Sequence, residues 1–280
     1  MKKAFLVGVN DYKPAGAGGP DLNGCVNDVK DMANTLVICG FEPKHMRLCT
    51  DRSATKENIL QGLKWLTTGS GPADSLVFFY SGHGSQVADT NHDEIDHSDE
   101  ILCPHDIDFG RQVFITDDDL RDSFAALPVG ANLEVILDSC HSGTATRAGN
   151  GLADGGRRSR SRFLAPPVDY SFHIDYEPRL VRRRILQPGN SHRDALIVPG
   201  LNHTLWAACK DNQTSEETEI KGQVRGVFTY QFCKILRRSG GAITRAKLDR
   251  LVTAALKREG FEQTPQLETT KEELLEQPFV

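Results

Sequence analysis

The chain has 280 residues, of which 39% are hydrophobic and 25% are charged, and its formal net charge is -5 at pH 7. This length is enough to bury a full core, and the composition excludes a disordered or fibrous class. The negative charge argues against a general nucleic-acid-binding role, because non-specific binding to phosphates needs a basic surface. No apolar run approaches the length of a membrane span, so we predict no membrane association.

The number and spacing of the cysteines indicate the redox state of the compartment in which the protein is expected. Seven of them are spread along the chain, an odd number without a C-x-x-C pair. This pattern favours free thiols in a reducing compartment over a disulfide framework. The apolar run at the N-terminus is too short for the core of a secretory signal. We therefore expect a cytoplasmic protein, and we expect it to be a monomer.

The first part of the chain alternates apolar runs with amphipathic patterns. The expected strands lie at residues 3–9, 46–49 and 74–80, and the expected helices at 23–39 and 55–66. Apolar residues three and four positions apart are typical of a helix that buries one face. Alternation of strands and helices predicts right-handed β-α-β crossovers and a mainly parallel sheet.

The second part is less regular. An acidic segment at 89–108 precedes Thr116, which is followed by three aspartates, a pattern typical of a helix start. Residues 144–193 carry several Arg, no Lys and no clear period. The other expected elements are strands at 133–137, 203–209 and 266–268, helices at 228–238 and 243–257, and a polar loop at 210–219.

Two of the apolar strands end in residues of catalytic type. His83 follows the strand at 74–80 between two glycines, and Cys140 follows the strand at 133–137. Chemistry in parallel sheets collects beyond the carboxyl ends of strands. A thiolate is a strong nucleophile and a nearby imidazole manages its proton, so the pair predicts acyl transfer. Cys140 alone could be an ordinary buried thiol, and His141 is a competing base, although adjacent side chains point apart.

The residues around this pair suggest how a substrate would bind. Glycines beside His83 let a substrate approach the backbone, and the N–H groups of Gly84 and Cys140 are candidates for an oxyanion hole. Asp138 is an acid that interrupts the mainly apolar run at 133–137, and burying it without a partner would be costly. A cationic substrate side chain would satisfy it.

These segments resemble a known family. Y-S-G-H-G-S-Q (80–86) and D-S-C-H-S-G (138–143) are similar to the two catalytic motifs of the metacaspases, which include the prokaryotic orthocaspases. Supporting matches are L-N-G-C-V-N-D-V-K-D-M (22–32), I-T-D-D-D-L (115–120) and C-K-D-N-Q-T-S (209–215). The resemblance implies a caspase-like three-layer α/β fold, with six to eight mostly parallel strands and helices on both faces. It also implies peptide hydrolysis after Arg or Lys.

The same resemblance assigns substrate-binding residues. It implies that Asp28 lines one pocket with Asp138, and that Cys25 and Ser81 lie near its wall. Two carboxylates facing a guanidinium would give charge-assisted, bidentate recognition. Without the resemblance, Asp28 would be interpreted as a surface acid on an amphipathic helix.

Calcium is the metal that the family suggests. Asp99, Asp117 and Asp118 match three of the four aspartate ligands of calcium-dependent metacaspases, but the fourth position is Arg147 here. An arginine cannot ligate a cation and repels it. We therefore predict weak or absent calcium dependence and no required cofactor.

We expect one caspase-like peptidase domain over residues 1–280. Its expected parts are a catalytic part at 1–143, a flexible Arg-rich insertion at 144–202 and a smaller part at 203–280. The insertion offers many arginines to an acidic pocket, which predicts self-cleavage. The candidate positions are Arg158, Arg160, Arg162 and Arg184.

The sequence thus predicts a cysteine endopeptidase whose substrates are peptides or proteins with Arg or Lys at the cleaved position. The alternative is a catalytically silent caspase-like interaction module, which the presence of His83 and Cys140 disfavours. A nucleotide-binding α/β protein is also disfavoured, because the loop after the first strand lacks both G-x-G-x-x-G and a phosphate-loop lysine.

Overall fold

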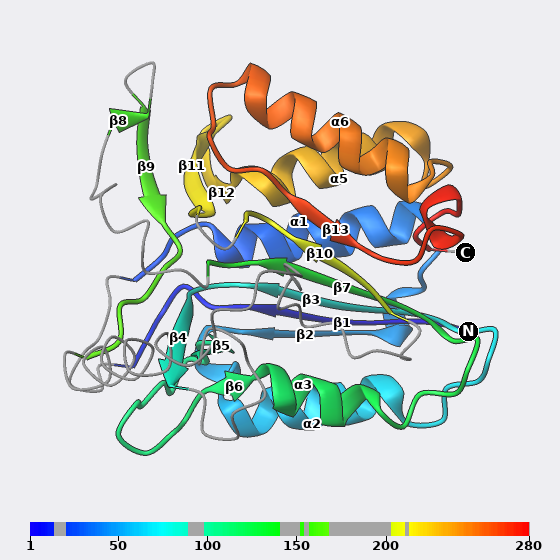
Figure 1. Ribbon diagram of the computed structural model, residues 1–280, viewed down its shortest axis with the longest axis horizontal. Helices are drawn as coiled ribbons and strands as arrows, with labels where there is room; N and C mark the ends of the chain where they lie inside the picture. The colour runs from blue at the N-terminus through cyan, green and yellow to red at the C-terminus, as the bar shows by residue number, and fades with distance from the viewer. Residues whose placement is uncertain are drawn as a thin grey trace, which may run out of the picture.

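The computed structural model describes residues 1–13, 21–88, 98–140, 152–153, 157–167, 203–210 and 213–279. A six-stranded sheet forms the middle of the molecule (Figure 1). Its strands are β1 (Lys2–Gly8), β2 (Met46–Thr50), β3 (Ser75–Ser81), β7 (Asn132–Asp138), β10 (His203–Ala207) and β13 (Gln266–Glu268). They lie in the order β13-β10-β7-β3-β1-β2, and all neighbours are parallel except β13, which is antiparallel at the edge.

Helices cover both faces of this sheet (Figure 1). One face carries α1 (Cys25–Ile38), α5 (Val227–Ser239) and α6 (Arg245–Arg258), and the other carries α2 (Lys56–Thr67) and α3 (Asp117–Phe124). Strand side chains alternate between the faces, so Phe5 and Val7 of β1 join one apolar cluster and Ala4 and Leu6 the other. The predicted three-layer α/β fold is therefore confirmed.

The starts of two helices follow directly from the sequence. The Thr55 hydroxyl accepts a hydrogen bond from the Asn58 N–H (3.3 Å) at the start of α2. At α3, the Thr116 hydroxyl accepts from the Asp119 N–H (3.1 Å) and the Asp119 carboxylate accepts from the Thr116 N–H (3.2 Å). This reciprocal capping satisfies two donors that the helix itself cannot.

Two smaller antiparallel sheets lie beside the main one. The first contains β4 (Gly84–Ala88), β5 (Ser98–Leu102) and β6 (Ile115–Thr116), and the second contains β8 (Leu152–Ala153), β9 (Arg157–Ser161), β11 (Glu216–Ile220) and β12 (Gln223–Gly226). The main strands β1, β3 and β7 point towards the side where β4 and β9 lie (Figure 1). The carboxyl ends of the central strands therefore meet both small sheets.

The polar loop expected at 210–219 is wrong in its second half. Residues 216–220 form β11, which pairs with β12 through Ile220 and Gln223 and with β9 through Glu217 and Arg160. Lys221 and Gly222 have φ values of 54° and 78°, which suit the two-residue turn that closes a hairpin. The sequence did not indicate β11 because four of its five residues are polar.

The central strand β7 contains a second buried acid, which has a structural role. The Glu134 carboxylate accepts hydrogen bonds from Arg245 Nε (2.8 Å) and Nη2 (2.6 Å) and from Trp206 Nε1 (2.5 Å). Burial raises the pKa of Glu134 to about 7, while the Arg245 guanidinium opposes this rise. Glu134 thus fastens α6 to the sheet and leaves Asp138 as the acid at the strand end.

Within the described residues, no helix combines the length and the apolar character needed to cross a lipid bilayer.

Candidate active site

The ends of β3 and β7 bring the two predicted catalytic residues to one edge of the sheet. Ser81 of β3 and Asp138 of β7 are register partners, and the Gly82 N–H donates to the Asp138 carbonyl (3.3 Å). His83 and Cys140 each follow two residues after this pair, and both are fully buried. Adjacent parallel strands therefore place them at the same level, as expected from the two apolar runs.

Tyrosines fix the backbone of His83. Its N–H donates to the Tyr12 hydroxyl (2.6 Å), and its carbonyl accepts from the Tyr80 hydroxyl (2.7 Å). The Tyr12 ring lies 4.9 Å from the imidazole, centroid to centroid. A Cβ atom on Gly82 would lie only 2.5 Å from the Tyr80 hydroxyl, so this position requires glycine.

Two partners hold the Cys140 thiol. Its Sγ donates to the Ser215 carbonyl (3.3 Å) and accepts from the Ser215 N–H. The second thiol, Cys209, forms a side-chain hydrogen bond with Cys140, and this bond together with burial raises the pKa of Cys209 well above its usual value. Cys209 therefore stays protonated beside Cys140.

Three carboxylates surround one guanidinium next to this thiol. The Nη2 of Arg162 lies 2.6 Å from Asp28 and 3.5 Å from Glu217, and its Nη1 lies 3.0 Å from Asp138. Nη1 also donates to the Ser81 hydroxyl (2.9 Å), which in turn donates to Asp28 (2.9 Å). All these side chains are buried. We call Asp28, Asp138 and Glu217 the acidic site.

Backbone and hydroxyl donors orient the carboxylates of the acidic site. Asp28 accepts from the Gly226 N–H (3.0 Å), and Asp138 accepts from the hydroxyls of Ser215 (2.6 Å) and Thr229 (2.5 Å). Glu217 accepts from the N–H groups of Asn23 and Gly24, both at 2.9 Å, just before α1. Buried carboxylates are tolerated only when paired and hydrogen-bonded, and this site meets both conditions.

Glu217 is the site residue that sequence reasoning missed. It lies on β11, in the stretch expected to be a loop, so its burial was not foreseen. The turn signal of Gly222, between two stretches that contain β-branched residues, could have indicated the hairpin on which Glu217 lies. The Cys25 thiol was expected at the wall of the site; it is fully buried at the start of α1, and burial raises its pKa while Arg162 opposes the rise.

The segment around Arg162 lies extended between β11 and β4. The Arg162 N–H donates to the Ser215 carbonyl (3.0 Å), and the Arg162 carbonyl accepts from the Gly84 N–H (3.0 Å). Two residues further along the chain, the Leu164 N–H donates to the Gly84 carbonyl (2.9 Å). An extended segment that pairs with a strand edge and places alternate side chains in the protein is a common mode of peptide recognition.

Comparison with known proteins identifies the family. A family model described as "Metacaspase, peptidase C14 domain" matches residues 2–148. The chain belongs to the metacaspase family. A metacaspase-1 of Scheffersomyces stipitis is 34% identical over 260 residues, which cover 84% of this chain and 62% of the relative. A metacaspase-1A of Aspergillus oryzae is 32% identical, with 85% and 61% covered.

The chain therefore spans about three-fifths of the length of these curated metacaspases. A metacaspase-1 of Meyerozyma guilliermondii is 30% identical over 96% of this chain and 69% of the relative. Among solved structures, protein GSU0716 from Geobacter sulfurreducens matches with a TM-score of 0.67, over 100% of this chain and 98% of that one. Its identity is 24%, so this likeness bears on the fold alone.

The aspartates that match the metacaspase calcium ligands lie on two neighbouring elements, β5 and α3. Asp99 lies on β5, while Asp117 and Asp118 form the first turn of α3, where Asp118 pairs with Arg121. The described part of the chain contains no group of three or more His, Cys, Asp or Glu side chains that could hold a metal ion. Arg147 and the competing base His141 lie outside the described residues. These three aspartates alone do not fit a calcium site.

The four candidate self-cleavage positions have different surroundings. Arg162 occupies the acidic site. Arg160 lies on β9, and its Nη1 donates to the Asp21 carbonyl at the protein surface. Arg158 is also on β9, where only its backbone is described, and Arg184 lies outside the described residues.

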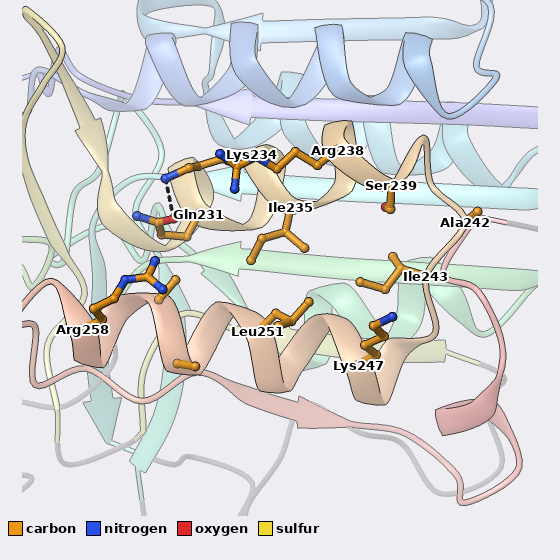
Figure 2. Close-up of a pocket in the computed structure, with 12 residues that line it drawn as sticks. Gln231, Lys234, Ile235, Arg238, Ser239, Ala242, Ile243, Lys247, Leu251 and Arg258 are labelled. Atoms are coloured by element: carbon orange, nitrogen blue, oxygen red, sulfur yellow. Dashed lines mark hydrogen bonds between the residues drawn. The ribbon is translucent and has the colours of Figure 1, made fainter.

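A groove between α5 and α6 has a different character (Figure 2). Its floor includes Ile235, Ile243 and Leu251, and Lys234 and Arg238 lie along its α5 side. The residues that line it include no His, Cys, Asp or Glu. It therefore lacks the thiol and the imidazole of the predicted catalytic pair.

The electrostatics of the acidic site predict that the affinity for an added guanidinium depends on pH. Burial raises the pKa of Asp28 to about 7, while the Arg162 guanidinium lowers it and the Asp138 carboxylate raises it. Without a bound guanidinium the lowering effect is lost, so the pKa of Asp28 lies higher still. Binding a guanidinium therefore releases a proton, and affinity is expected to rise with pH above about 7, by up to about tenfold per pH unit.

This prediction can be checked by calorimetric titration of N-acetyl-arginine methylamide into a chain carrying Cys140→Ala and Arg162→Gln. Adding Asp28→Asn should flatten the pH dependence, because the amide does not titrate. An unchanged pH slope after Asp28→Asn would contradict the role assigned to this carboxylate.

Proposed function

We propose that the chain is a cysteine endopeptidase that hydrolyses peptide bonds after Arg or Lys. The observation that carries the proposal is Arg162, whose guanidinium lies in the acidic site while its carbonyl accepts from the Gly84 N–H. The Ser215 carbonyl accepts from both the Arg162 N–H and the Cys140 thiol, so the nucleophile lies beside the same peptide. The segment thus has the arrangement of a bound substrate.

In the proposed reaction, His83 takes the proton of the Cys140 thiol, and the thiolate attacks the carbonyl carbon of the residue in the acidic site. The carbonyl oxygen becomes an oxyanion, which accepts hydrogen bonds from the N–H groups of Gly84 and Cys140. The C–N bond breaks as His83 gives its proton to the leaving amine. Water, with His83 as base, then hydrolyses the thioester, which releases the acid product and restores the thiol.

Self-cleavage is part of this proposal, and of the four candidate arginines Arg162 is the best supported. The cut would fall between Arg162 and Phe163. Purified chain incubated at neutral pH is expected to give fragments ending at 162 and beginning at 163, detected by intact mass. The Arg162→Gln chain should stay whole, because the substitution removes the internal arginine that is cleaved. It should still cleave an added Arg substrate, because Cys140 and His83 are unchanged.

Arg160→Gln is the matched control. Arg160 lies on the same segment, but its side chain donates to the exposed Asp21 carbonyl and does not enter the acidic site. It should be cut at the same bond. Cutting of the Arg162→Gln chain at an unchanged rate, or cutting of a Cys140→Ala chain, would contradict the proposal. An intact wild-type chain with no activity on Arg substrates would instead favour the silent interaction module.

The remaining sequence predictions stay proposals of the same kind. We propose one peptidase domain with parts at 1–143, 144–202 and 203–280, acting as a monomer in the cytoplasm on peptide or protein substrates. Weak or absent calcium dependence is supported by the pairing of Asp118 with Arg121. Peptidase activity that survives a chelator would support it further.

A further inference from the structure

We propose that the active site contains a second side-chain subsite, which takes an aliphatic residue two positions after the cleaved bond. Leu164 occupies it in this structure. The inference rests on the proposed function, in which the bond between Arg162 and Phe163 is the one cleaved.

The burial pattern of the segment carries the proposal. Leu164 is only 3% exposed, whereas Phe163 is half-buried and Ala165 is exposed. In extended backbone, side chains two positions apart point to the same side. Arg162 and Leu164 therefore both enter the protein, and Phe163 points away from it.

The surroundings of Leu164 define the chemistry that the subsite accepts. Leu164 belongs to the large apolar cluster, which also includes Val87 of β4 and Leu102 of β5. Leu102 is the register partner of Gly84, the residue that bridges to Phe163. An aliphatic side chain gains by burial there, and a charged one would be desolvated without a partner.

The backbone couples this subsite to the reacting bond. The Gly84 N–H donates to the Arg162 carbonyl (3.0 Å), and the Gly84 carbonyl accepts from the Leu164 N–H (2.9 Å). Gly84 thus fixes the position of the Arg162 carbonyl, whose C–N bond is cleaved, and of Leu164, which lies two positions after that bond. Removing the buried side chain at position 164 would align the reacting carbonyl less well with the nucleophile. The subsite is therefore expected to affect kcat as well as KM.

Substrate peptides test the proposal without touching the fold of the enzyme. The peptides are internally quenched and have the sequence Q-S-R-F-X-A-P, where X corresponds to residue 164 and is Leu, Ala or Asp. The enzyme carries Arg162→Gln and Leu164→Ala, so that its own segment is not cut and does not fill the subsite with leucine. The Leu peptide is expected to exceed the Ala peptide in kcat/KM by about 10- to 100-fold, with the Asp peptide lowest.

The matched control changes the residue that points away. Replacing Phe by Ala at the position of Phe163, with X kept as Leu, should alter kcat/KM by no more than about threefold. In the chain itself, Leu164→Ala should slow self-cleavage more than Phe163→Ala does. Equal cleavage of the Leu, Ala and Asp peptides would overturn the subsite and leave the peptidase proposal intact, whereas cleavage of none of them would overturn both.

Discussion

Replacing Cys140 with alanine is expected to lower kcat for an arginine substrate by about 10⁴- to 10⁶-fold. The substitution removes the atom that forms the covalent intermediate, and neither the acidic site nor the oxyanion donors can replace it. The comparison is made in the Arg162→Gln chain, so that failure to self-cleave does not confound the rate. Hydrolysis of a fluorogenic arginine amide measures the effect, with circular dichroism as the check on folding.

A buried thiol elsewhere provides the control for this loss. Cys233 lies in α5, is fully buried and belongs to the apolar cluster that α1, α5 and α6 form with the main sheet. Cys233→Ala should lower stability through the cavity it leaves but keep kcat within about twofold. Retention of more than a tenth of the activity by Cys140→Ala would rule out this cysteine as the nucleophile.

The second large effect is expected at Asp138. Asp138→Asn should lower kcat/KM for arginine substrates by about 30- to 5000-fold, the range for removing one charge of a buried hydrogen-bonded pair. Its Oδ1 lies 3.0 Å from Nη1 of the bound arginine, and an asparagine would lose the charge there. The same substitution also weakens the bonds to Ser215 and Thr229, which hold β11 and α5 against the site.

Asp31→Asn is a suitable control for Asp138→Asn. Asp31 pairs with Arg225 at 2.8 Å, but this pair is partly exposed and lies outside the acidic site. Its loss should change kcat/KM by less than about twofold, because neither partner of this pair contacts Arg162 or the three carboxylates of the acidic site. Comparing matched substrates with arginine and with its neutral isostere citrulline adds a second readout, because Asp138→Asn should narrow the difference between them. Unaltered discrimination would contradict charge recognition by Asp138.

The main sheet could be predicted because its strands are buried on both faces. The stretches that form β1, β3 and β7 are mainly apolar, which is typical of strands buried on both faces. Few other assignments of secondary structure fit such short apolar stretches. The positions of His83 and Cys140 followed from the same runs, since each residue comes directly after a strand. Local chemistry also sufficed for the start of α3, where Thr116 and Asp119 cap each other.

The rest depends on contacts between distant parts of the chain. Glu217 is buried only because β11 packs beside the start of α1, where Asn23 and Gly24 donate to it, and no local pattern encodes that meeting. Asp28 looks like a surface acid on its helix, and its burial arises from the approach of Gly226. The choice of Arg162 among several arginines depends on β9 pairing with β11, a register that alternation alone does not fix.

The occupied acidic site has a kinetic consequence. Arg162 belongs to the same covalent chain as Cys140, so its effective concentration at the nucleophile is set by the intervening chain and not by the amount of protein. Tethered segments of this kind can reach effective concentrations on the order of millimolar. Self-cleavage should therefore be first order and independent of dilution, while any external substrate must compete with the internal one until that segment is cut and leaves.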